Sequence, residues 1–257
     1  MHVHLPKPLH GWRPFVGEVG IIVLGVLIAL SAEQLVGRWQ WRERVAETRA
    51  QLDAELHRDA RSAYEGLAVA PCLDQQLHAI DMALASARQT GRLEATPPFT
   101  PPLHMFTEDT WLNARALQVA DHLSAEQVED YSRLFFFPRD LGVAVIELHK
   151  EAAELRPLMN GLSPISTEEV SDYQRQAGRV HELLDRVELS ETLLLLELEQ
   201  DKIRLTEVEM TRALTGDRQW AGRCAAPPDL EANFRRLADP AAKPNSRIES
   251  TFRPLRS

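Results

Sequence analysis

The spacing of histidines and carboxylates is the first test for metal chemistry in this sequence. A di-iron helical bundle needs two Glu-x-x-His motifs on facing helices, and the 257 residues contain no copy. His181 and Glu182 are adjacent, but the second histidine of a zinc-protease helix is missing. His78 and Asp81 lie one helical turn apart, a spacing that is ordinary for polar pairs on a solvated helix face. The sequence therefore predicts no metal site.

Motifs of cofactor binding and catalysis are also missing from the sequence. His2, His4 and His10 could bind a transition metal weakly, but an N-terminal tail lacks the fixed geometry of a site. The chain has no Gly-rich phosphate loop and no Gly-x-Ser-x-Gly elbow. Catalytic triads assemble in space and leave no local spacing. The missing motifs nevertheless favour a protein that is not an enzyme and binds no cofactor.

The two cysteines, Cys72 and Cys224, are a candidate disulfide. Both lie beside predicted helix ends, and a bridge would close a loop of about 150 residues, worth roughly 5 kcal/mol in the chain-entropy model. An oxidising compartment would allow the bridge, whereas a cytoplasmic domain would keep two separate thiols. Two cysteines are too few for a four-cysteine zinc site.

The composition of the chain indicates its fold class, and its net charge restricts the kinds of partner that it can bind. Gly is scarce, at 12 residues, and only 6% of the chain is aromatic, while Leu, Ala, Glu and Arg, all good helix formers, are abundant. No segment shows a strand pattern of useful length, so the sequence predicts an all-α fold. The formal net charge of −9 argues against nucleic acid as a partner, because phosphate binding needs a basic face.

The most apolar segment of the chain, residues 15–36, predicts a transmembrane helix. Its charge-free centre, residues 19–32, covers only about 21 Å, but the wider segment covers about 33 Å, enough for the hydrocarbon core. Aromatic residues border both ends, which is typical of the two membrane interfaces. Two alternatives remain open: a cleaved signal peptide, with Ala29-Leu30-Ser31 as the cleavage site, and a buried helix of a soluble protein. The bordering aromatics are Trp12, Phe15, Trp39 and Trp41.

One face of this helix is suited to contact with another helix in the membrane. At about 100° per residue, a set of mostly small residues falls on one side together with a carboxylate. Small residues let two helix backbones approach closely in lipid, so the pattern predicts a homodimer or a membrane-protein partner. Alternatively, the carboxylate lies at headgroup depth, in the first helical turn, where the helix dipole favours an anion. The residues of this face are Glu18, Ile22, Gly25, Ala29 and Ala32.

Orientation cues around the apolar segment conflict. Lys7 and Arg13 precede it, whereas four arginines follow it at positions 38, 42, 44 and 49. Counting basic residues alone would place the C-terminal side in the cytoplasm. Long domains, however, translocate largely regardless of charge, and a short basic tail before an apolar run is typical of a signal-anchor. We therefore expect a periplasmic C-terminal domain, by a narrow margin.

The remaining chain predicts an elongated antiparallel helical bundle, residues 37–216, that continues directly from the span. Apolar residues recur at helical spacing up to Pro71, where the pattern predicts a break, and a Pro-rich loop follows at residues 92–104. Thr107, Ser124 and Ser166 are predicted helix caps, the last two within capping boxes. The last helix is expected to run from residue 166 to residue 214, with residues 193–196 deepest in the core. The tails, residues 1–14 and 217–257, lack periodicity.

The N-terminal region resembles a group of uncharacterised bacterial single-span membrane proteins. The resemblance rests on His10-Gly-Trp-Arg and on residues 17–30, which match an apolar run of the form GExxIIVxGVLIAL. Residues 110–111, 114–122 and 131–134 are similar to a second block of that group. The resemblance covers the first forty residues well, the middle weakly and the tail hardly at all. It implies a retained span and an inner-membrane location, and no catalytic residues.

Two functions agree with these expectations. The first is a membrane-anchored interaction or scaffold protein at the bacterial envelope, with the lipid bilayer and a partner helix as its contacts. The second is a ligand-sensing bundle. Because no second span and no output domain is recognisable, a sensor of this kind would act through a partner membrane protein.

Overall fold

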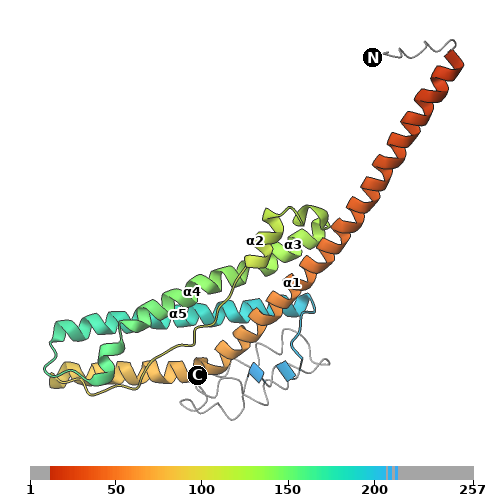
Figure 1. Cartoon of the computed structure of the whole chain (residues 1–257). Coiled ribbons are helices and arrows are strands. Elements are labelled where there is room, and N and C mark those ends of the chain that lie inside the picture. The colour runs from red at the N-terminus through yellow and green to blue at the C-terminus, as the bar shows by residue number, and fades with distance from the viewer. Residues whose placement is uncertain (1–11, 207, 210–211, 214–257) are drawn as a thin grey trace, which may run out of the picture.

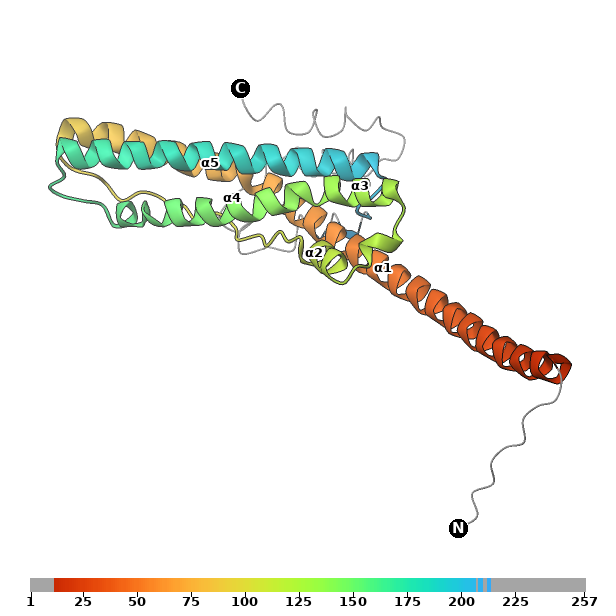
Figure 2. The same ribbon diagram turned by 90° about the horizontal axis from the view of Figure 1, so that it is seen from above.

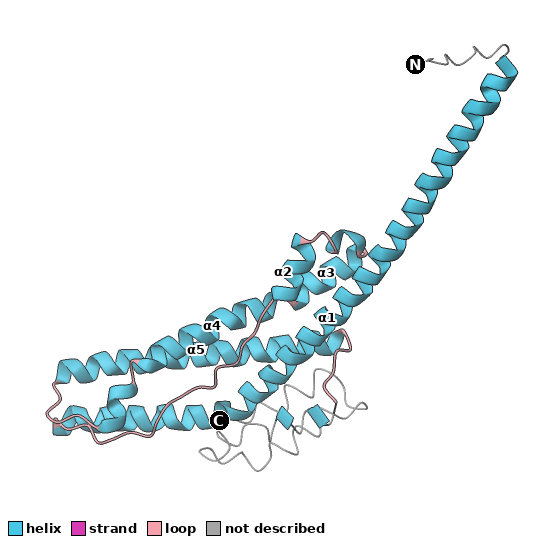
Figure 3. Cartoon of the chain, in the orientation of Figure 1, coloured by secondary structure: helices cyan, strands magenta, loops and turns pink. Residues whose placement is uncertain are grey.

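The computed structural model describes residues 12–206, 208–209 and 212–213, and this part of the chain is all-α (Figures 1 and 3). A very long helix, α1, is followed by an extended segment, a group of short helices and two further long helices. Residues Leu93 and Leu162 form an isolated bridge, and no strand occurs among the described residues. The helices are α1 (Trp12–Thr90), α2 (Asp109–Ala116), η1 (Ala120–His122), α3 (Ala125–Leu134), α4 (Phe136–Ala153), η2 (Arg156–Asn160) and α5 (Thr167–Gln200).

Helix α1 is continuous for 79 residues, about 120 Å at 1.5 Å per residue. The predicted break at Pro71 is therefore wrong: Pro71 lies inside the helix. Leu67 and Leu73, on either side of the proline, are both buried in the bundle core. Packing of this kind outweighs the roughly 3 kcal/mol that a proline costs inside a helix. Figure 1 shows α1 bending along its length, as expected for a helix with an internal proline.

The bundle consists of the C-terminal half of α1 packed antiparallel against α5, with α4 beside them (Figures 1 and 2). Each helix contributes one apolar stripe to a single core, and each fully buried Leu or Val adds roughly 1.5–3 kcal/mol. The predicted antiparallel bundle is thus confirmed. Its fully buried large apolar residues include Leu52, Leu56, Leu77, Ile80 and Leu84 of α1, Leu141 of α4, and Val170, Val180, Leu194 and Leu198 of α5.

An extended strap, residues 91–108, returns from the far end of α1 to α2. Leu93 and Leu162 exchange backbone hydrogen bonds of 2.8 and 2.9 Å, and the Thr96 amide donates to the Leu158 carbonyl at 3.1 Å. The prolines of the strap donate no backbone hydrogen bond and suit such an extended course. The predicted Pro-rich loop is therefore a packed fourth element of the bundle.

The close approach of the strap to α4 depends on a glycine. A Cβ at Gly142 would lie 2.9 Å from the backbone oxygen of Phe106, which is closer than side chains pack. Gly178, inside α5, has no atom within 4 Å of the corresponding position. The two glycines occupy similar helix interiors, and only one of them touches the strap.

We expect Gly142→Ala to destabilise the protein by about 1–3 kcal/mol, because the methyl group pushes the strap off α4. Gly178→Ala is the matched control and should stabilise by up to about 1 kcal/mol through helix propensity. Urea unfolding of the detergent-solubilised full chain, followed by circular dichroism, measures both. Equal stabilisation by the two alanines would show that the strap does not press on α4.

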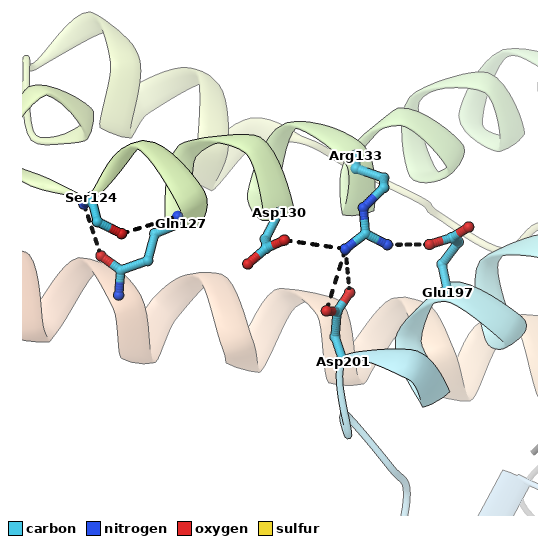
Figure 4. Close-up of polar contacts among 6 residues, drawn as sticks. All are labelled: Ser124, Gln127, Asp130, Arg133, Glu197 and Asp201. Carbon is cyan, nitrogen blue, oxygen red and sulfur yellow. Dashed lines mark hydrogen bonds and ion pairs between the residues drawn. The ribbon is translucent and has the colours of Figure 1, made fainter.

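Helix α5 ends at Gln200, so the expected continuation to residue 214 is wrong. Asp201 caps the end, and Lys202 takes a left-handed φ of 62°. Arg133 of α3 forms ion pairs with Glu197 and Asp201 at this end of α5 (Figure 4). Its Nη2 atom lies 3.0 Å from Oδ2 of Asp201. A turn closed by tertiary ion pairs leaves no local sequence signal.

Two of the three predicted caps are confirmed. Ser124 and Ser166 each form a full capping box, with Gln127 and Glu169 as the reciprocal partners. Thr107 does not cap α2, which begins at Asp109 with no side-chain cap. The hydroxyl of Thr107 donates instead to a carboxylate of α1, described below.

The apolar end of α1 projects from the bundle without another element beside it (Figures 1 and 2). It is the single helix among the described residues that is long and apolar enough to cross a membrane, and its apolar window is entirely exposed. Where α1 meets the bundle, the ring of Trp41 stacks on that of His122, with centroids 3.9 Å apart. Trp39 stays 63% exposed.

Candidate functional site

Two buried carboxylates, Glu55 and Asp59, lie on the core-facing side of α1, one helical turn apart. Their exposed fractions are 1% and 2%. Glu55 accepts hydrogen bonds from the Thr107 hydroxyl and from the Thr110 amide, the latter at 3.1 Å. The end of the strap and the start of α2 are therefore tied to α1 through a carboxylate, a contact worth more than a neutral hydrogen bond.

Asp59 has the less satisfied carboxyl group of the two. The Thr107 amide donates to it, but its Oδ2 atom has no hydrogen-bond partner in the described part of the chain. The pKa of Asp59 is raised from 3.8 to about 8, mainly by burial and also by the nearby charge of Glu55, against the opposing charge of Arg58. Asp59 is therefore mainly protonated at neutral pH.

Glu191 of α5 is a third buried carboxyl group, and α1 has a notch for it. A Cβ on Gly66 would overlap the Glu191 carboxyl, which would then have to move from its present position. The side chain is 2% exposed. Burial raises the pKa of Glu191 well above its usual range, and the charge of Glu188 adds to the effect.

A cavity of about 20 Å³ adjoins Glu191, between α1, α4, α5 and the strap. This volume holds about one water molecule. The strap side is formed by Pro101, Pro102 and His104, and the helices contribute mainly apolar side chains. His104 Nε2 lies 3.4 Å from Glu65 Oε2 on α1, so the strap also carries an ionisable contact here.

Asp59 and Glu191 can take up and release protons, which is the chemistry that the geometry supports. Each lies between helices and the strap, where the charged form is expensive. A group of three or more histidine, cysteine or acidic residues able to hold a metal ion does not occur among the described residues. The cavity has room for water and not for a substrate.

The residues predicted for membrane contact are not brought against any other part of the described chain. Glu18, Ile22, Gly25, Ala29 and Ala32 are all exposed on α1. A Cβ on Gly25 would have no atom within 4 Å. The face is open to an external helix, and its role stays a prediction.

The two cysteines are only partly described. Cys72 lies in α1, half-buried, where its sulfur accepts a hydrogen bond from Gln76 at 3.5 Å. Cys224 lies outside the described residues. The pairing of Cys72 with Cys224 therefore stays a prediction.

Sequence reasoning missed the buried carboxyl groups, although a signal was present. Glu55 and Asp59 fall on the stripe of Leu52 and Leu56, where a solvated charge is out of place. Glu191 precedes the apolar run 193–196 in the sequence, yet it is more buried than Leu193, which is 38% exposed. Of that apolar run, Leu194 and Leu195 lie in the core.

Comparison with known proteins supplies no further guide to the site. Neither protein-family models, nor curated proteins, nor solved structures give a match to the chain.

Proposed function

We propose that this protein is a single-pass inner-membrane protein of the bacterial envelope that acts as an interaction or scaffold protein and not as an enzyme. The observation that carries the proposal is α1: one helix contains both the exposed apolar segment, residues 15–36, and a wall of the bundle. Lipid is the environment that removes such a surface from water.

The continuity of α1 gives the proposed span a mechanical role. A helix without a loop transmits a rotation or a shift of its membrane end directly to the residues that it packs in the bundle. The stacked rings of Trp41 and His122 hold α1 against η1 where the helix enters the bundle. Contact of the span with a second copy or with another membrane protein would therefore reach the strap and α5.

The small-residue face supplies a specific contact for the span. Gly25 and Ala29 are one turn apart and lie beside Ala32 on the exposed surface of α1. Close helix approach in lipid depends on residues of this size, with van der Waals packing as the driving force. The bulk domain is proposed to lie in the periplasm, on the sequence cues given above.

We expect replacement of Gly25 and Ala29 together by leucine to weaken association of the full chain in membranes by about ten-fold, equivalent to about 1.4 kcal/mol. The two leucines would keep the helix backbones apart. Energy transfer between labelled full-length chains, or crosslinking to a partner in membranes, measures the effect.

Gly20→Leu is the matched control, because Gly20 lies on the opposite side of the helix from Ala29. It adds the same bulk and should leave association unchanged. Association that is unaffected by the double substitution, or weakened equally by the control, would contradict a contact through this face.

A second candidate function is a ligand-sensing bundle that acts through a partner membrane protein. The cavity beside Glu191 favours it, because a buried carboxyl group beside a water-sized cavity costs stability when it is charged. The strap is the element that could respond, since Pro101, Pro102 and His104 form its wall of the cavity.

A further inference from the structure

The site of Glu191 is built from all four elements of the bundle. Gly66 of α1 provides the notch, Val145 and Leu148 of α4 provide an apolar wall, and Glu188 precedes Glu191 on α5. The strap closes the cavity with prolines and His104.

No opposite charge is dedicated to Glu191. The titratable groups around the cavity are Glu188 on the same helix, His104 on the strap and Glu65 on α1. His104 is already engaged with Glu65 at 3.4 Å, and α4 contributes only apolar side chains to the cavity. A charged Glu191 would therefore face a like charge and apolar walls, with one water at most to solvate it.

Of the four walls of the cavity, the strap can move away with the smallest loss of stability. The other three walls are helices whose apolar stripes form the core, and separating them would expose that core to water. The strap has no internal helical hydrogen bonds, and its described backbone bonds lie towards its two ends, at Gly91, Leu93 and Thr96 and at Thr107 and Glu108. Lifting residues 101–104 admits water to Glu191 without unfolding the bundle.

We propose that Glu191 is a proton-binding site that controls the docking of the strap. With the proton bound, the neutral carboxyl group is buried and the strap stays closed. When the proton leaves to solvent, the O–H bond breaks, its electron pair stays on the carboxylate, and the strap moves away so that water reaches the charge. The ligand that the bundle senses is thus a proton, and release of this proton opens the strap locally.

This inference concerns the bundle and does not need a contact made by the span. The leucine substitutions at Gly25 and Ala29 test the span, whereas the experiment below measures only the strap. The two ideas can therefore fail separately.

The test is hydrogen–deuterium exchange of the full chain in detergent micelles at about pH 6 and about pH 9, corrected for the intrinsic pH dependence of exchange. Peptides that cover residues 99–107 should exchange several-fold faster at the higher pH. In Glu191→Gln, a neutral side chain of the same shape, the strap should stay closed at both values.

Glu182→Gln is the matched control, because Glu182 is an exposed residue of the same helix. It should behave like the wild-type protein. Infrared spectra provide a second measurement that does not depend on the folding of a variant: the wild-type protein should lose the carbonyl band of a protonated carboxyl group as the pH rises. Glu191→Gln should lack that component.

Three results would overturn the proposal. The first is strap exchange in the wild-type protein that does not change with pH after correction. The second is pH-dependent opening that persists in Glu191→Gln, including the case in which Asp59→Asn abolishes it instead. The third is a loss of carbonyl band intensity with rising pH that is as large in Glu191→Gln as in the wild-type protein, since Asp59 accounts for only one such group.

Discussion

Replacement of Asp59 by asparagine is expected to make the protein more stable than the wild type at about pH 9, and to change stability little at about pH 4. Asparagine resembles the protonated carboxyl group in size and stays neutral at every pH. The wild-type side chain must be buried with a charge above its pKa, beside Glu55 and with no partner for Oδ2 in the described chain.

The sign follows from proton binding. The folded protein holds the Asp59 proton up to about pH 8, whereas the unfolded chain releases it near 3.8. Between these values the folded state binds more protons, so the free energy of unfolding falls as the pH rises, by at most about 1.4 kcal/mol per pH unit. The stabilisation is complete below 3.8 and lost above 8. Asp59→Asn removes this slope, so its gain at high pH is several kcal/mol.

Urea unfolding of the full chain in detergent, repeated across this pH range, measures the difference. Asp121→Asn is the matched control, since Asp121 is exposed in η1, and its pH profile should follow that of the wild type. An Asp59→Asn profile parallel to the wild-type profile would show that Asp59 is ionised at little cost in the folded protein.

Phe135→Ala is expected to have the second large effect, a loss of about 3–5 kcal/mol in the free energy of unfolding. Phe135 is 1% exposed and lies between α3 and α4. Its ring is 6.5 Å from those of Trp111 and Tyr131, so it joins α2 and α3 to the start of α4. Removal of the ring leaves a cavity at the joint of three helices.

The neighbouring residue provides a control of the same chemistry. Phe136 is 53% exposed, and its contact with Arg139, 5.7 Å from the ring centroid, is a surface cation–π interaction. Phe136→Ala should cost no more than about 1 kcal/mol. The fluorescence of buried Trp111 follows unfolding in both variants. Similar losses for the two variants would mean that the aromatic cluster does not hold the joint.

The sequence predicted the structure correctly where it depends on interactions between residues close in the chain. The apolar stripes of α1, α4 and α5 follow from helical periodicity, and the boxes at Ser124 and Ser166 depend on residues three positions apart. The antiparallel bundle was predictable for the same reason.

Prediction failed where a distant residue competes with a local signal. Pro71 indicates a break, but Leu67 and Leu73 on either side of it are both buried in the core. Thr107 has the side chain of a helix cap, yet Glu55, 52 residues earlier, takes its hydroxyl. The end of α5 is fixed by Arg133, which lies 68 residues before Asp201.

The sequence by itself determined an all-α chain with one exposed apolar segment and a bundle attached to it, because helix periodicity and hydrophobicity are properties of neighbouring residues. Only the tertiary structure decided which carboxyl groups are buried away from solvent. The burial of Glu191 depends on Gly66 of another helix and on the strap that covers both. The free-energy cost of charging the carboxyl group arises only when helices and strap together exclude water from it.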